Sequence, residues 1–329
     1  MTTATQLPSR QILLDIYRRM TLIKQNDERF RAVIKAGKII APYYSPRGQE
    51  AIPAAVSVNL GDSDYICTIY RGIHDMIAKG VPLNLLWAEI AGKATGTCKG
   101  KGGPMHVTHP QSGVMVTTGI VGASMPIANG LALAAQIRGE QRVAVAYFGD
   151  GASNIGAFHE ALNMAAVWKL PVVFVCQNNG YGEHTRYEIA TSAAKISDRA
   201  AGYRMPGVTV DGNDPVAMYA VAREAIERAR AGQGPTLIEA TTFRFFGHVF
   251  GDADKYMQPG EKEAAMARDP VPRFRAWLIE QGHANAAQLA DMEAAIEKEI
   301  DAAVEFALSS PSPDVGELQL DVFARGEAA

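Results

Sequence analysis

The stretch Val143-Ala-Val-Ala-Tyr-Phe-Gly-Asp-Gly151 decides the fold of this chain, together with its counterpart Val172-Val-Phe-Val-Cys-Gln-Asn-Asn179. Each begins as an apolar run of strand length and ends in polar or glycine residues. The intervening residues 158–168 carry a helical pattern, which predicts parallel strands joined by a helix. The carboxyl ends of neighbouring parallel strands open onto one crevice, where ligands usually bind. We therefore expect Asp150 and Asn179 to meet at a ligand site.

The rest of the chain extends this pattern. A third strand signal, residues 236–240, follows a helical pattern over residues 215–230. The alternation predicts an α/β fold, a doubly wound and mostly parallel sheet with helices on both faces. We expect one diphosphate-binding domain over residues 1–329, with an N-terminal helix at about 9–37 and a C-terminal helical extension at about 270–310. The last helix, opened by a capping box, is expected to pack on the domain's own sheet, with a partner subunit as the alternative.

Two segments interrupt the alternation. Residues 96–122 are dense in glycine, and a structureless loop of that length inside a domain is usually functional. Residues 251–262 are polar and weakly patterned, so we expect a mobile loop there.

Composition excludes several classes of protein. The 329 residues are 47% hydrophobic and carry a net charge of −3, without the basic stripe of a nucleic-acid-binding protein. The three cysteines have no paired spacing, and Cys176 lies in an apolar run, which favours an inert thiol in a reducing compartment. The chain begins without an apolar signal core and has no run of membrane-spanning length. We expect a cytoplasmic protein that binds neither nucleic acid nor membrane.

Asp150 and Asn179 supply hard oxygen ligands of the kind that Mg²⁺ and Ca²⁺ prefer. Gly-Asp-Gly alone is common turn chemistry, but a second strand end with an amide oxygen favours a metal site. Gly149 and Gly151 permit close approach of a phosphate, which would face the free N–H groups of the following helix.

Several segments together resemble the alpha subunits of thiamine-diphosphate-dependent 2-oxo acid dehydrogenase first components, of the pyruvate and acetoin types. The resemblance covers nearly the whole chain and implies the transketolase-like fold that binds thiamine diphosphate. The segments that carry it are residues 98–106 (CKGKGGPMH), 119–122 (GIVG), 149–151 with 178–179, 163–171 (NMAAVWKLP) and 246–248 (FGH).

The resemblance also implies a set of site residues. Asp150, the Asn179 side chain and the Tyr181 backbone carbonyl would bind Mg²⁺ beside the cofactor's phosphates. The remaining cofactor-binding positions are Tyr70 and Arg71 at the diphosphate, Gly119 and Val121 at the aminopyrimidine, Gly151, Ala152 and His248. For Arg71 the alternative is a surface salt bridge.

His248 is the expected catalytic residue. In the resembled family the matching histidine lies near the diphosphate and the substrate carbonyl, where a near-neutral pKa suits proton transfer. The alternative is a partly buried imidazole without a chemical role. His106 and His74 are weaker candidates.

The chain departs from the pyruvate type in three places. Tyr44 stands where pyruvate-type chains carry a histidine, and Ile73 replaces another, with His74 one place later. Both changes argue against simple pyruvate specificity. Val249 replaces the serine that is phosphorylated in mitochondrial members. Residues 182–185 and 245–252 look more like the acetoin type.

The implied reaction is cleavage of a 2-oxo acid or acetoin, with transfer of the acyl unit to a lipoyl group of a transacylase partner. A glutamate facing the pyrimidine comes from a second domain in this family, so we expect a separate beta subunit, probably as α2β2. The alternatives are a non-catalytic or regulatory paralogue and a nicotinamide-dependent oxidoreductase. A nicotinamide-dependent oxidoreductase would need a strand-to-helix Gly-x-Gly-x-x-Gly turn, and no strand signal in this sequence is followed by that pattern.

Overall fold

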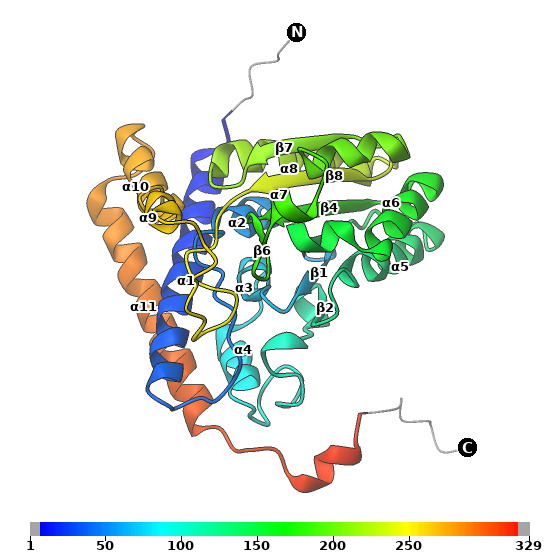
Figure 1. Cartoon of the computed structure of the whole chain (residues 1–329). Coiled ribbons are helices and arrows are strands. Elements are labelled where there is room, and N and C mark those ends of the chain that lie inside the picture. Colours follow the sequence, from blue (N-terminus) through cyan, green and yellow to red (C-terminus); the bar gives the residue numbers. More distant parts are fainter. Residues whose placement is uncertain (1–6, 322–329) are drawn as a thin grey trace.

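A parallel six-stranded sheet forms the centre of the molecule in the computed structural model, which describes residues 7–321 (Figure 1). Its strand order is β2-β1-β3-β4-β8-β7, and every neighbouring pair is parallel. The strands are β1 (Tyr65–Ile69), β2 (Val114–Thr118), β3 (Ala144–Gly149), β4 (Val172–Asn178), β7 (Gly207–Asp211) and β8 (Thr236–Thr241). A separate short hairpin pairs β5 (Tyr181–Gly182) with β6 (Thr185–Arg186). The α/β fold predicted from the sequence is confirmed.

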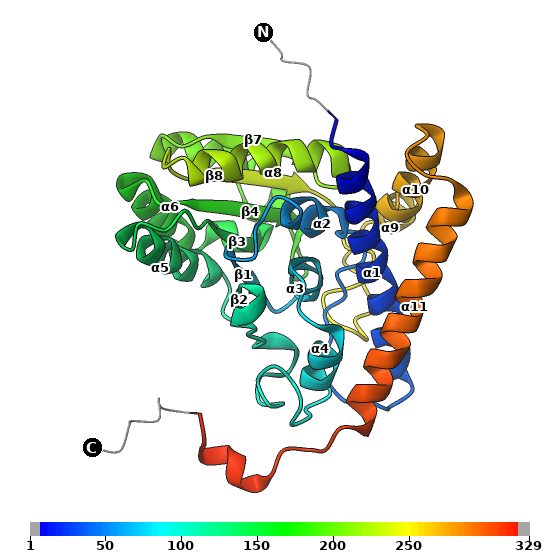
Figure 2. The same cartoon turned by 180° about the vertical axis from the view of Figure 1, so that it is seen from behind.

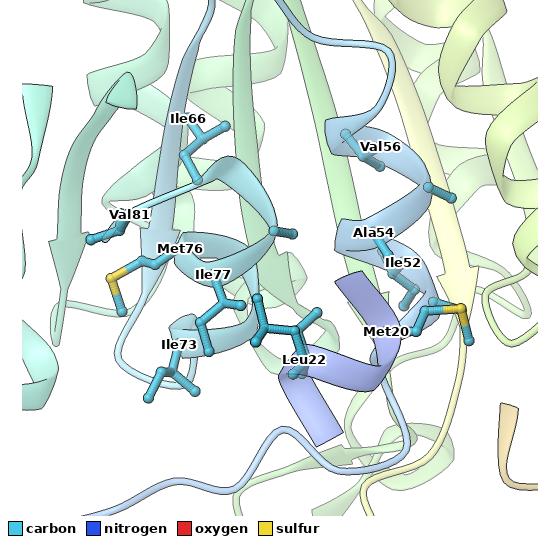
Figure 3. Close-up of a cluster of buried hydrophobic side chains, with 14 of the residues drawn as sticks. Met20, Leu22, Ile52, Ala54, Val56, Ile66, Ile73, Met76, Ile77 and Val81 are labelled. Carbon is cyan, nitrogen blue, oxygen red and sulfur yellow. The ribbon is translucent and has the colours of Figure 1, made fainter. Parts of the chain in front are cut away.

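Successive side chains of β3 enter two hydrophobic cores because they point to opposite faces of the sheet. Val145 and Tyr147 join one core, whereas Ala146 and Phe148 join the other. The first core lies under α1 (Arg10–Lys35), α2 (Ala51–Ser57), α3 (Ile73–Lys79) and α8 (Pro215–Arg230). The second lies under α5 (Ser124–Ile137) and α6 (Gly156–Trp168). Figure 2 shows the first group of helices, and Figure 3 shows side chains from α1, α2, α3 and β1 in their shared core.

The terminal helices pack on the chain itself. Ser9 caps α1 by accepting from the Ile12 N–H, and Asn285 and Gln288 form the predicted capping box of α11 (Ala286–Ser309). Helix α11 lies along α1 and against α4 (Leu83–Ile90), away from the sheet (Figure 2). The Tyr17 hydroxyl donates to Glu293 across this contact at 2.5 Å. The C-terminal helix therefore packs on its own chain, as expected, but it packs on helices and not on the sheet.

The remaining helices are short. They are α7 (Tyr187–Ala190), α9 (Glu261–Met266) and α10 (Pro270–Glu280), with 3-10 turns η1 (Gly103–Met105), η2 (Pro110–Ser112), η3 (Asp150–Asn154), η4 (Ile196–Tyr203) and η5 (Val315–Gln319).

The glycine-dense stretch is not structureless, so that expectation was wrong. Residues 114–118 within it form β2, at the edge of the sheet. Its first part wraps around the buried carboxylate of Glu89, which accepts N–H groups of Cys98 and Gly100 at one oxygen and of Gly102 and Gly103 at the other, at 2.7 to 3.0 Å. These amides are already satisfied by the protein, so this loop is not a phosphate cradle.

Cys67 and Cys176 are free and buried in strands, as expected of inert thiols. Among residues 7–321, no helix has the length and apolar character needed to cross a membrane. The sequence shows no apolar signal core in residues 1–8, and the first six of these residues lie outside the described part of the chain.

Candidate active site

The carboxyl ends of the strands surround a cavity of about 560 Å³. The chain reverses direction across the sheet between β1 and β3, and such a switch point leaves a crevice beyond the strand ends. All the residues predicted to form the site line this cavity. They are Tyr70, Arg71, Gly119, Val121, Asp150, Gly151, Ala152, Asn179, Tyr181 and His248.

Asp150 and Asn179 approach the cavity from adjacent strands, because β3 and β4 pair in register up to Gly149 and Gln177. Asp150 is only 1% exposed, and its Oδ2 atom has no hydrogen-bond partner. Burial raises the pKa of this carboxyl to about 6, although nearby backbone N–H groups and arginines oppose the shift. A buried carboxylate oxygen without a donor is costly unless a cation meets it.

The backbone after Asp150 is shaped by close contact between two glycines. A Cβ atom added to Gly151 would lie 3.0 Å from the Gly182 Cα atom, so the η3 turn and the β5–β6 hairpin meet at glycine. Ala152 follows in η3, which leads into α6. This close packing brings the backbone to the cavity wall.

Arg71 lies just beyond β1 and is buried. Its guanidinium donates to the carbonyls of Ser45 at 2.9 Å and His248 at 2.8 Å, and it has no carboxylate partner within the described chain. The alternative of a surface salt bridge is therefore wrong. Burial, aided by Arg244, lowers its pKa to about 10, which keeps the side chain cationic at neutral pH.

Arg244 is a second buried cation of the cavity, and the sequence analysis missed it. Its guanidinium carbon lies 5.6 Å from the ring centres of both Tyr181 and Tyr256. It also donates to the Glu183 carbonyl and, at 2.8 Å, to the Tyr256 hydroxyl. A charged residue inside the aromatic run 243–246, directly after a strand, was the available signal.

His248 lies in the cavity wall between these arginines. Its Nδ1 atom is 3.4 Å from Arg71 Nη2 and 3.5 Å from Arg244 Nη1. Burial and then the two arginines lower its pKa to about 4, so the imidazole is neutral at pH 7. Because Nδ1 faces two donors, the proton of the neutral ring resides on Nε2.

The segment after β8 holds this histidine in place. The backbone N–H of His248 donates to Asp252 Oδ2 at 2.6 Å, and the Tyr256 hydroxyl donates to the same oxygen at 2.7 Å. Burial opposes ionisation of Asp252, but these hydrogen bonds and the Asp254 N–H prevail and lower its pKa to about 2. Residues 251–262, which we expected to form a mobile loop, thus hold His248 in place through Asp252 and Tyr256.

The other flagged residues divide into two groups. Tyr44 lines the cavity, with its ring edge-on to Tyr70 and His248 at centre distances of 4.6 and 5.4 Å. Ile73 and His74 are buried in α3 and are not among the lining residues, so they do not shape the cavity directly.

The donor set fits a diphosphate bound with a hard divalent cation. Asp150 offers a free oxygen, and Arg71 and Arg244 supply positive charge. Within residues 7–321, no cluster of three or more His, Cys, Asp or Glu side chains could hold a metal alone, so other oxygens, such as those of amides, backbone carbonyls and phosphates, would have to complete the shell. Fold and cavity together define an α/β protein equipped for an anionic ligand at its switch point.

The comparisons with known proteins specify this class further. Residues 18–316 match the model of the family described as dehydrogenase E1 component, and the chain belongs to that family. It is accordingly a thiamine-diphosphate-dependent oxidoreductase.

Three relatives are similar over nearly their full length. The acetoin:2,6-dichlorophenolindophenol oxidoreductase alpha subunit of Bacillus subtilis is 44% identical over 95% of this chain and 93% of the relative. The protein of the same name from Cupriavidus necator is 40% identical, with 95% of both chains covered. The pyruvate dehydrogenase E1 component alpha subunit of Porphyra purpurea is 37% identical over 95% of this chain and 93% of the relative.

Proposed function

We propose that this chain is the alpha subunit of an acetoin-type dehydrogenase, which cleaves acetoin or a 2-oxo acid and passes the acyl unit to a lipoyl group of a transacylase. The observation that carries the proposal is the unpartnered, buried oxygen of Asp150 beside Asn179, in a cavity that also contains two buried arginines. Thiamine diphosphate, when bound, supplies the carbanion chemistry.

The residues of this chain hold the cofactor and stabilise negative charge that develops on the substrate. Asp150, Asn179 and the Tyr181 carbonyl would bind Mg²⁺, and Arg71 with Arg244 would neutralise the diphosphate. Gly151 and Ala152 would present backbone to the phosphates, next to Tyr70. Gly119 and Val121 would contact the aminopyrimidine through their backbone.

His248 would act at the substrate oxygen. Its neutral ring carries a proton on Nε2 and can donate a hydrogen bond to an oxygen that becomes negatively charged. The arginines that depress its pKa also keep Nδ1 from taking up a proton.

Acetoin is favoured as the substrate by two observations. The relatives of 44% and 40% identity are acetoin-type alpha subunits, whereas the pyruvate-type relative is 37% identical. Tyr44 lines the cavity in place of the pyruvate-type histidine, so the wall there has a phenol ring instead of a titratable imidazole.

A separate beta subunit would complete the site, as α2β2. Val121 is 50% exposed and Ile120 is 71% exposed beside the cavity, which are large apolar side chains left open to solvent. Exposed apolar groups around a cavity are typical of a surface that a partner covers. A non-catalytic paralogue is disfavoured because both metal-binding oxygens are retained.

The decisive experiment uses this chain co-expressed with the beta subunit. Asp150→Asn keeps the side-chain shape but removes the charge, and Asp62→Asn, at an exposed position remote from the cavity, is the matched control. Binding of thiamine diphosphate in the presence of Mg²⁺ is expected to weaken by roughly 100-fold in Asp150→Asn only. Reduction of dichlorophenolindophenol is expected to be faster with acetoin than with pyruvate.

Each of three results would contradict one part of the proposal. Unchanged cofactor affinity in Asp150→Asn would remove the metal assignment. Faster dye reduction with pyruvate than with acetoin would remove the substrate assignment. If the chain without its partner turned over substrate as fast as the pair, the shared site would be refuted.

A further inference from the structure

A buried amide contact lies behind the candidate metal ligand Asn179. The Asn179 Nδ2 atom donates to Gln49 Oε1 at 3.0 Å, and Gln49 is fully buried. On the other side of the same amide, the Tyr181 N–H donates to Asn179 Oδ1 at 3.2 Å. A carboxamide has one oxygen and one NH₂ group, so these two contacts determine which way it faces.

We propose that Gln49 is a positioning residue that turns the Asn179 oxygen toward the metal. The inference rests on the proposed function. The NH₂ group of Asn179 is held by Gln49, which leaves the oxygen on the side of Tyr181, the residue whose carbonyl is expected to bind the same ion. Second-layer partners of this kind orient metal ligands and tune the affinity of the site.

The turn that carries Gln49 is built to hold it still. Gly48 has a φ of +96°, and a Cβ atom added there would lie 2.2 Å from the Phe243 carbonyl oxygen. The Thr242 hydroxyl donates to the Gly48 carbonyl at 2.9 Å. Because the turn is fixed against the segment that follows β8, Gln49 cannot withdraw from Asn179 without moving that segment.

A second set of buried polar groups lies behind Gln49. Gln177 Nε2 donates to Asp75 Oδ1 at 2.8 Å, which leaves Gln177 Oε1 to accept from His74 Nε2 at 3.1 Å. Gln49 Nε2 lies 3.5 Å from that His74 nitrogen. Both nitrogens are donors, so this contact is packing and not a hydrogen bond. His74, considered above as a weak site candidate, therefore packs behind Gln49.

The test measures metal binding directly. Mn²⁺ binding to the αβ complex with thiamine diphosphate is followed by electron paramagnetic resonance. Gln49→Met preserves the volume but removes the acceptor, and it is expected to weaken Mn²⁺ binding about 10- to 100-fold. Gln25→Met is the matched control, because it is the same substitution at a partly buried glutamine of α1, whose amide donates to the Glu293 carbonyl on α11 and does not contact Asn179. Its Mn²⁺ affinity should stay close to that of the wild type.

A double-mutant cycle separates positioning from general damage. If Gln49 acts through Asn179, Gln49→Met should add no further loss of Mn²⁺ affinity in an Asn179→Ala background. Additive losses would overturn the inference, as would wild-type affinity in the single variant.

A crystal structure of the loaded wild-type complex gives a check that does not require a folded variant. We expect Asn179 Nδ2 to remain within hydrogen-bond distance of Gln49 Oε1 while Oδ1 contacts the metal. An Asn179 amide turned away from Gln49 would refute the inference. If the wild-type complex bound no Mn²⁺ in the presence of the cofactor, the proposed function would fail. If it bound Mn²⁺ and the Gln49→Met variant bound it equally well, only the positioning role of Gln49 would be rejected.

Discussion

The carboxylate of Glu89 offers the sharpest test of how the glycine-dense loop is held. It accepts four backbone N–H groups, two at each oxygen, at 2.7 to 3.0 Å. Glu89→Gln keeps one oxygen and replaces the other with an NH₂ group, which is itself a donor. Two loop amides then lose their acceptor. At about 1–3 kcal/mol for each buried N–H group left unpaired, the expected cost is roughly 2–6 kcal/mol.

Urea unfolding and amide hydrogen exchange measure this cost. We expect either a lower free energy of unfolding or, if the loop opens locally, faster exchange of the Cys98, Gly100, Gly102 and Gly103 amides. Glu297→Gln, at a solvent-exposed glutamate on α11, is the control and should change the free energy of unfolding by less than about 0.5 kcal/mol. The reasoning is refuted if Glu89→Gln matches the control in both measurements.

Two further predictions concern the cavity and the turn beside it. In the cofactor-free protein, NMR titration of His248 should give a pKa of about 4, so protonation reduces stability as the pH falls from about 6.5 toward 4. Arg244→Gln should raise that pKa, and a pKa above 6 in the unmodified protein would contradict the electrostatic argument. Gly48→Ala should lower the free energy of unfolding by more than Gly37→Ala, which should cost only about 1–2 kcal/mol, because both glycines have positive φ but only Gly48 meets a carbonyl oxygen. Equal losses in chemical denaturation would show that the close contact does not matter.

Strands with strong local signals could be predicted from the sequence. The apolar runs of β3, β4 and β8 and the helix over residues 215–230 were recognised with bounds close to those observed. β1, β2 and β7 were missed because they are short and lie beside glycine or turn residues. The order β2-β1-β3-β4-β8-β7 depends on how the crossovers fold in space, and no local pattern encodes it.

The candidate site divides in the same way. Asp150 and Asn179 follow strand signals directly, so the rule for parallel sheets places them together from the sequence alone. Arg244 and Gln49 reach the cavity region from segments without regular structure, and their contacts depend on folding. Gln49 lies 130 positions from Asn179, so their contact had no local signal.

Asp150 and Glu89 illustrate how a single physical rule separates two buried carboxylates that lie against glycine-bearing backbone. Each carboxylate oxygen of Glu89 accepts hydrogen bonds from two N–H groups of its own chain. Glu89 therefore needs no external ligand, and the loop around it stabilises the fold. Asp150 retains an oxygen without a partner. Because buried polar atoms are usually satisfied in folded proteins, that oxygen, whose residue also lines the cavity, is where we propose that the cation binds.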